Sequence, residues 1–251
     1  MNKIIKFLLL CLLFCFGQVV SAMEPSNEED PLNQGITQYL VGRRMYYNAE
    51  GRFAEAKETL LAAKALFLQL PAGAEQYCWL AKVEFLAGEL EAARGEKRRA
   101  QQAFTESGRW AEKALKANKS SSTAHQLLAD AYMRLMDYQG ALYMMSKGPQ
   151  AVKLLNTAVS LEPNNCPALI SLATYYINAP TVGGGSVTKG VEALEKALVS
   201  PDAHDHFLSN LWLGYAYRKL KKEDEAQRYF LKALEIYPQS LWAKEWMNER
   251  K

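Results

Sequence analysis

Small and large apolar side chains recur at helical spacing in the stretch that ends at Pro238. Two such runs are separated by a charged segment, in which Lys221 and Lys222 precede three acidic residues. Cations suit the C-terminal end of a helix and anions suit an N-terminal end, so this segment predicts a turn between two helices. Pro238 then ends the second helix. The small positions let the two helices approach closely, and the large ones fill the space between them.

The spacing of seven positions resembles that of a tetratricopeptide repeat, a helix–turn–helix unit of about 34 residues. These positions are Leu213, Gly214, Tyr217, Ala226, Phe230, Ala233 and Pro238. One unit cannot bury both of its faces, so further units must stack on it. The resemblance implies an all-α fold, a right-handed α-solenoid of about five such repeats with a C-terminal capping helix.

Less regular matches place the other repeats before this one. The repeats are predicted at about residues 37–70, 74–121, 122–165, 166–206 and 207–240. A capping helix follows at residues 241–250, where Trp242 and Trp246 share a face and should cover the open end of the solenoid. The repeat domain therefore spans residues 37–251. Residues 23–36 are acidic and polar and are predicted to be a flexible lead-in.

Three repeats carry residues beyond the pattern. The charged segment Glu89–Arg99 is predicted to be a solvated face. The extra residues of the third repeat, which include Tyr138, Tyr143, Met144, Met145 and Pro149, are interpreted first as core filling and second as a binding surface, because methionine serves both roles. In the fourth repeat, residues 183–186 read Gly-Gly-Gly-Ser before a helix. They could cradle an anion through free amides, but a tight turn with Ser186 as the N-cap is favoured.

The first 22 residues are identified as a secretory signal peptide. Lys3 and Lys6 precede the apolar run from Phe7 to Phe16, and a small-residue cleavage site ends at Ala22. An uncleaved anchor is the alternative, but the run is short for a bilayer, which needs about 20 apolar residues. The mature protein is thus expected to be secreted across a membrane, into the periplasm if the source is a Gram-negative bacterium. No integral membrane segment is predicted for the mature chain.

Net charge and cysteine content bear on the partners of the chain and on its disulfide state. The chain of 251 residues has a formal net charge of +3, and Lys3 and Lys6 leave with the signal peptide. This balance gives no electrostatic reason to expect nucleic acid or an anionic membrane as a partner. Cys78 and Cys166 remain in the mature chain and fall two repeats apart. A disulfide needs Cα atoms within about 7 Å, so two buried free thiols are predicted.

The sequence shows little that predicts chemistry. His204-Asp205-His206 has two histidines at a spacing that puts them on different sides of a helix, whereas metal-binding helices use i and i+4. This segment is predicted to be the polar entry to the fifth repeat. No metal and no cofactor are predicted. No nucleophile–base arrangement stands out either, so the chain is not expected to be an enzyme.

The family resemblance implies that the first helix of each repeat lines a concave groove that binds an extended peptide or a partner protein. Carried over repeat by repeat, the groove residues are Gln126, Asp130, Met133, Arg134, Thr174, Asn178, Tyr215, Arg218 and Lys219. Arg134 and Arg218 are predicted to hold an acidic or C-terminal carboxylate group of the partner, because a guanidinium matches a carboxylate. The predicted function is an exported protein–protein interaction scaffold without catalysis. The oligomeric state is left open, and a homo-oligomer is one alternative.

A second resemblance concerns export together with the insert that runs from Pro180 to Ser186. These features resemble the T component of tripartite (TRAP) periplasmic transporters, although the chain lacks a lipid-attachment cysteine. That resemblance implies the alternative function, a periplasmic transport accessory that meets a substrate-binding protein. The Met- and Tyr-rich stretch from Met133 to Met145 could then hold a small apolar ligand.

Overall fold

The computed structural model describes residues 30–48 and 52–249. The predicted signal peptide and residues 23–29, the first half of the predicted lead-in, lie outside these residues. The chain divides into two units, Met1–Asp30 and Pro31–Lys251, and all the described helices belong to the second. The described residues contain ten α-helices, one short 3-10 helix and no strand.

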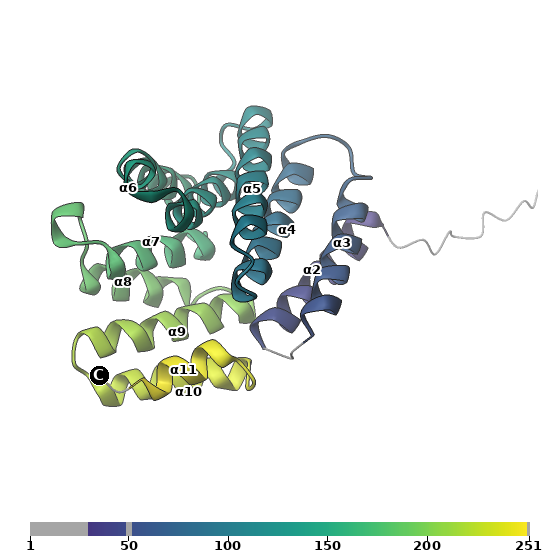
Figure 1. Cartoon of the computed structure of the whole chain (residues 1–251). Coiled ribbons are helices and arrows are strands. Elements are labelled where there is room, and N and C mark those ends of the chain that lie inside the picture. Colours follow the sequence, from purple (N-terminus) through teal and green to yellow (C-terminus); the bar gives the residue numbers. More distant parts are fainter. Residues whose placement is uncertain (1–29, 49–51, 250–251) are drawn as a thin grey trace, which may run out of the picture. The chain divides into compact units, whose positions relative to one another are not determined.

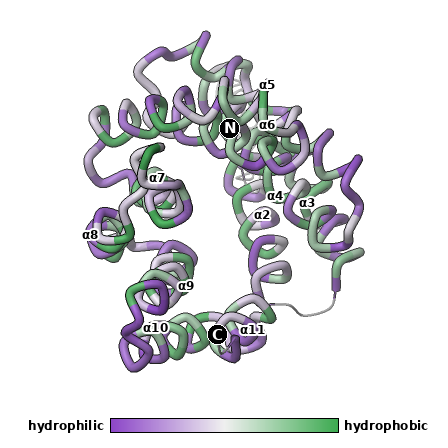
Figure 2. Tube along the Cα trace, turned by 60° about the vertical axis from the view of Figure 1, so that its left-hand side comes forward, coloured by the Kyte–Doolittle hydropathy of each residue, from purple (hydrophilic) through white to green (hydrophobic). Residues whose placement is uncertain are grey.

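The α-helices follow one another as antiparallel hairpins (Figure 1). They are α2 (Pro31–Tyr47) with α3 (Phe53–Phe67), α4 (Ala74–Ala93) with α5 (Lys97–Ala117), the bent α6 (Ser122–Leu161), α7 (Cys166–Asn178) with α8 (Val187–Ala197), α9 (Ala203–Lys219) with α10 (Glu223–Ile236), and the closing helix α11 (Leu241–Asn248). Neighbouring helices in this order pack on each other, and Figure 2 shows α7, α8, α9 and α10 stacked in sequence. The prediction of an all-α solenoid is confirmed.

At the close helix crossings, a glycine of one helix faces a large apolar side chain of the neighbouring helix. A Cβ atom placed on Gly214 would lie 2.6 Å from the Phe230 ring, and one on Gly88 would lie 2.6 Å from the Phe104 ring. Both phenylalanines are fully buried. Since real carbon atoms do not approach this closely, glycine is what allows α9 to meet α10 and α4 to meet α5 at these points.

The first helix begins earlier than predicted. Helix α2 starts at Pro31, so residues 31–36 are helical and the prediction of a flexible lead-in is wrong for them. Proline suits the first turn of a helix because it lacks the amide hydrogen that would go unpaired there. Gly35 is buried, and a Cβ there would lie 2.6 Å from the ring of Phe67 in α3. Packing therefore extends the helix beyond the residues that match the repeat.

The charged insert of the second repeat is only partly a solvated face. Residues 94–99 are exposed, as predicted. Glu89 and Glu91 instead belong to α4, and Glu91 is only 6% exposed. Lys57 of α3 lies 2.6 Å from Glu91, and Arg134 of α6 lies 2.5 Å from Glu89. The prediction is wrong for these two glutamates because each one pairs with a cation from a neighbouring helix.

The extra residues of the third repeat lengthen its two helices. Helix α6 bends at Gly140, whose φ of 77° lies in the left-handed region that favours glycine. The residues beyond the bend are largely exposed: Leu142 is 85% exposed, Met144 52% and Met145 75%. Core filling is therefore the wrong interpretation for Met144 and Met145. Because these long apolar side chains are exposed, the second interpretation, a binding surface, agrees with the structure.

The glycine insert of the fourth repeat forms a tight turn around the 3-10 helix η1 (Thr181–Gly183). The amides of Gly183 and Gly185 both donate to the carbonyl oxygen of Pro180, and the Ser186 amide donates to that of Tyr176. Gly184 has a φ of 88° and also donates within the turn. The amides are thus used internally, which rules out the anion cradle. Ser186 caps α8 as predicted, accepting from the Lys189 amide.

The closing helix folds back onto the fifth repeat. Trp242 and Trp246 share a face as predicted, with ring centroids 5.1 Å apart. Trp246 packs against both Trp212 and Tyr215 of α9, at centroid distances of 4.9 Å and 4.7 Å. The aromatic pair therefore covers the first helix of the last repeat, which is where a solenoid needs a cap.

The first and the last hairpins of the unit contact each other. Arg43 of α2 lies 2.9 Å from Asp202, the N-cap residue of α9. Tyr47, at the end of α2, packs on His204 at a centroid distance of 4.3 Å and stacks near Tyr237. We call this the end contact. Arg43 and Asp202 are 159 positions apart along the chain, so no local sequence pattern predicts the end contact.

Candidate functional site

The end contact borders a partly open cavity on the inner faces of the first helices of the repeats, here called the inner chamber. Its volume is about 230 Å³. The inner chamber is lined by Tyr39, Leu40, Arg43, Tyr47, Trp79, Lys82, Phe85, Leu86, Gln126, Leu127, Asp130, Pro167, Ile170, Ser171, Asp202, His204, Asp205 and Leu208. These residues come from α2, α4, α6, α7 and α9 or from just before them. All five repeats therefore contribute to one site.

A second cavity of about 600 Å³ continues from the inner chamber, because the two share Tyr47, Phe85, Asp130, Ile170, Ser171 and Leu208. Glu89, Met133, Arg134 and Thr174 also line this second cavity. The structure thus brings together five of the predicted groove residues, Gln126, Asp130, Met133, Arg134 and Thr174, around the two connected spaces.

A third and larger hollow, of about 1010 Å³, lies between the two inserts. We call it the insert groove. It is lined by Met133, Arg134, Met136, Asp137, Met144, Met145, Gly148, Pro149, Val152, Thr174, Tyr175, Asn178, Ala179, Pro180, Val182, Gly183 and Trp212. Apolar side chains dominate this set, and Val182 at its rim is fully exposed. Four predicted groove residues, Met133, Arg134, Thr174 and Asn178, belong to it.

The predicted groove residues of the fifth repeat lie elsewhere. Arg218 donates to the carbonyl oxygens of Trp246 and Met247 at the end of α11, and it pairs with Glu223 at 2.6 Å. Lys219 donates to the carbonyl oxygen of Ile177 at 2.8 Å, at the end of α7. Cations at these positions satisfy helix C-terminal carbonyls, which is a structural role. Loss of Arg218 is therefore expected to loosen the closing helix.

Arg134 also has partners within the chain. Its Nε lies 2.5 Å from Glu89 and its Nη1 lies 2.7 Å from Asp137. Its guanidinium stands 5.1 Å from the centroid of the Phe104 ring. Two carboxylates thus already compensate this cation, so Arg134 is better suited to hold the walls of the two cavities together than to receive a partner's acid.

Asp130 is the acid shared by the inner chamber and the second cavity. Burial raises its pKa to about 7, although hydrogen bonds from Ser171 and Gln126 act in the opposite direction. The carboxyl therefore changes charge near neutral pH, in a place where a ligand would meet it.

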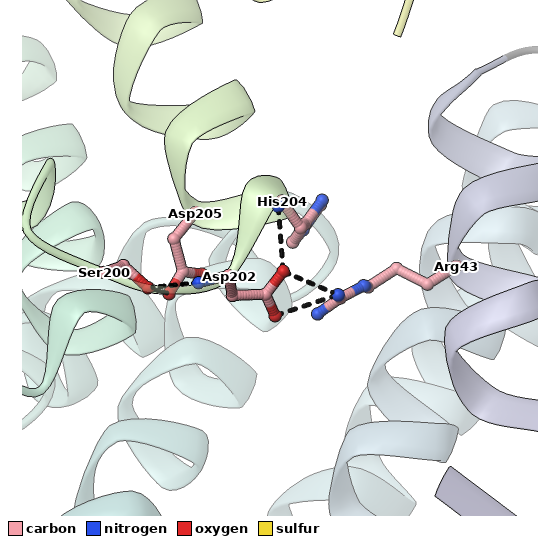
Figure 3. A network of polar contacts seen from close by, with 5 residues as sticks. All are labelled: Arg43, Ser200, Asp202, His204 and Asp205. Atoms are coloured by element: carbon pink, nitrogen blue, oxygen red, sulfur yellow. Dashed lines mark hydrogen bonds and ion pairs between the residues drawn. The ribbon is translucent and has the colours of Figure 1, made fainter. Parts of the chain in front are cut away.

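Polar residues just before α9 and in its first turn form one network with Arg43 of α2 (Figure 3). Both carboxylate oxygens of Asp202 accept from Arg43, and the Ser200 hydroxyl bonds to Asp205 at 2.6 Å. The amide of His204 donates to Asp202 at 2.9 Å, which caps α9. This geometry agrees with a polar entry to the fifth repeat. A capping aspartate could be found from sequence, but nothing local marks Arg43 as its partner.

His204 makes the end contact sensitive to acid. It is 7% exposed, its Nδ1 has no hydrogen-bond partner, and burial lowers its pKa to about 3, with the charge of Arg43 acting in the same direction. An unfolded histidine titrates near 6.5. Between these pH values the unfolded chain binds a proton that the folded chain does not bind. The free energy of unfolding should therefore fall as the pH decreases from about 6.5 towards 3.

Replacing His204 by phenylalanine should remove this part of the pH dependence while keeping a ring against Tyr47. Above pH 7, the difference in the free energy of unfolding between the variant and the natural protein should be constant. As the pH is lowered below about 6.5, this difference should shift in favour of the variant. Urea unfolding at a series of pH values measures it, and taking the difference between the two proteins cancels the contribution of Asp130. A difference that does not change with pH would contradict the role of His204.

The prediction of two buried free thiols is confirmed. Cys78 and Cys166 are free and buried. Across the described residues, no three or more His, Cys, Asp or Glu side chains are placed to hold a metal ion. None of the described helices is long and apolar enough to cross a membrane.

Comparisons with known proteins agree with this fold. Residues 209–240 match the family model of the tetratricopeptide repeat. The crystal structure of TTC0263, a thermophilic TPR protein of Thermus thermophilus, is 20% identical, with a TM-score of 0.55 over 86% of this chain and 94% of that chain. A structure of the human IFIT1 dimer with PPP-AAAA is 18% identical, with a TM-score of 0.55 over 90% of this chain and 55% of that chain. No curated protein matches the sequence.

The protein is thus an α-solenoid of helix hairpins. Its residues 209–240 form a tetratricopeptide repeat, and the chain has the fold of tetratricopeptide-repeat proteins.

Proposed function

We propose that this protein is an exported interaction scaffold that binds a short apolar segment of a partner protein in the insert groove. The observation that carries the proposal is the groove itself. Two segments that exceed the repeat pattern, the bend of α6 and the turn after α7, face each other across a hollow of about 1010 Å³. Extra residues that only lengthened the helices would not need to expose Met145 and Val182 to water.

The charges of the insert groove indicate what the segment carries. Arg134 and Asp137 are the charged residues that line it, and they are bonded to each other at 2.7 Å. A compensated pair favours an uncharged segment, because an added acid would compete with Asp137 and Glu89 for the same guanidinium. Methionine side chains adapt to different apolar shapes. The segment is therefore proposed to be apolar, and the acidic group predicted from the sequence is not part of this proposal.

Export rests on residues 1–22 of the sequence, and the periplasm is the proposed location if the source is a Gram-negative bacterium. The proposed scaffold performs no catalytic step.

The proposal can be tested with peptides selected from a random library displayed on phage. Selected peptides should be rich in aliphatic and aromatic residues. Their binding to the purified protein should weaken at least about tenfold in Met145→Glu and in Val182→Asp, since a charge would be brought into an apolar contact. Both side chains are exposed, so the variants should fold normally. Titration calorimetry with one selected peptide gives the affinities.

The matched control is Leu231→Glu, which places the same charge on an exposed leucine of α10, far along the chain from the inserts. This variant should bind like the natural protein. Peptides that bind all three variants equally, or a library that yields no specific binder, would move the docking surface away from the insert groove.

The second candidate is the transport accessory that meets a substrate-binding protein and holds a small apolar ligand. The size of the insert groove favours it as well, because small-molecule pockets occupy about 300–1,000 Å³. Native mass spectrometry of the protein purified from its own source separates the two candidates. A bound small molecule that is lost in Met145→Glu supports the accessory. A ligand-free protein supports the scaffold.

A further inference from the structure

The inner chamber contains a cation that no carboxylate of the described residues pairs with. Lys82 of α4 lines the inner chamber, and its Nζ lies 4.2 Å from the centroid of the Trp79 ring. In the described part of the chain, no acid lies within ion-pair distance of this ammonium, and it forms no hydrogen bond. Lys82 is partly buried, and this desolvation, together with the charge of Arg43, lowers its pKa, while the charges of Asp205 and Asp202 act in the opposite direction.

The other charged groups of the inner chamber have partners. Arg43 is bonded to both oxygens of Asp202. Asp205 is bonded to the hydroxyl of Ser200, and Asp130 accepts from Gln126. Burial also raises the pKa of Asp130 and of Asp205, which shifts both carboxyls towards their neutral forms. These acids consequently oppose a bound anion less than their number suggests, and Lys82 remains the group in need of an acceptor.

The rest of the inner chamber is suited to an apolar body. Tyr39, Trp79, Phe85, Leu86 and Ile170 form much of its wall. Its volume of about 230 Å³ exceeds that of an engineered protein cavity of about 150 Å³ that binds benzene. A molecule with a ring-sized apolar part therefore fits. Aromatic walls combined with a few polar groups are typical of small-molecule sites.

We propose that the inner chamber binds a small organic anion, whose carboxylate pairs with Lys82 and whose apolar body lies against Trp79 and Phe85. This site shares no lining residue with the insert groove. It therefore goes beyond the proposed scaffold function and stands or falls separately from it. The end contact forms one side of the site, so the ligand would also bridge hairpins from the two ends of the repeat unit.

The experiment compares benzoate with benzyl alcohol, its neutral analogue of similar size, using calorimetry and tryptophan fluorescence on the purified protein. Benzoate should bind, and benzyl alcohol should bind at least about tenfold more weakly, because its hydroxyl carries no charge to pair with the ammonium, and charge-assisted hydrogen bonds are the stronger kind. Lys82→Met should lose benzoate binding by a similar factor. Circular dichroism establishes whether the variant is folded. If Lys82→Met is not folded, Lys82→Gln is used in its place.

The matched control is Lys113→Met. Lys113 of α5 places its Nζ 3.9 Å from the centroid of the Trp110 ring, a similar arrangement outside the inner chamber, so this variant should bind benzoate normally. Met145→Glu should also leave benzoate binding unchanged. Equal binding of benzoate and benzyl alcohol, full binding by a folded Lys82 variant, or no binding of benzoate at millimolar concentration would each overturn the proposal.

Discussion

Replacing Gly214 by alanine is expected to lower the free energy of unfolding by about 1–3 kcal/mol, although alanine is the better helix former. The added methyl would lie 2.6 Å from two carbon atoms of the Phe230 ring, and that ring is fully buried. Either the ring must leave its rotamer or α9 must move away from α10. Gly214→Leu should cost more and should also loosen α11, because each unit of a stack supports the next.

Gly108→Ala is the control for this change. Gly108 is also buried within a helix, but a Cβ there would lie 3.5 Å from the Cβ of Ala131, which is ordinary contact. Alanine should therefore be neutral or stabilising at this position, by up to about 1 kcal/mol. Urea denaturation followed by circular dichroism measures both variants. If Gly214→Ala were as stable as Gly108→Ala, the close crossing of α9 and α10 would be wrong.

Replacing Arg43 by methionine is expected to destabilise the protein and to separate the two end hairpins. Removing one partner of a buried ion pair costs about 3–5 kcal/mol, and we expect about 2–3 kcal/mol here because the side chain of Asp202 is 39% exposed. Hydrogen exchange should increase in α2 and in the first turn of α9, which the end contact joins. Mass spectrometry of exchanged peptides locates the effect.

Arg109→Met provides the comparison, because Arg109 and Glu106 form an exposed pair within one helix. That variant should be nearly as stable as the natural protein. The effect of Arg43→Met should also shrink in acid. Burial by itself would raise the pKa of Asp202, but Arg43 and the His204 amide lower it overall. The ion pair therefore contributes its full stabilisation at pH values above the unfolded pKa of aspartate, and this contribution is lost as the pH falls through the lower, folded pKa. Unchanged exchange in α2 would contradict the end contact.

The candidate site was predicted in part. The repeat register placed Gln126, Asp130, Met133, Arg134 and Thr174 on inner helix faces, and these residues do line the connected cavities. The same register failed for Arg218 and Lys219 as open groove residues, because it gives only the face of a helix. It does not show which carbonyl groups of another helix lie within reach of that face.

The sequence by itself determined the all-α fold, the fifth repeat, the capping role of Ser186 and the buried free thiols. The first three follow from residues close together along the chain, where helical periodicity and capping chemistry act, and the free thiols follow from the two repeats that separate Cys78 from Cys166. Only the tertiary structure decided that Arg43 meets Asp202, that Glu89 and Glu91 pair with cations, that the two inserts face each other, and that Lys82 lacks an acid partner among the described residues. These facts depend on how hairpins curve and close over more than a hundred residues, and small differences in packing at each crossing set that curvature.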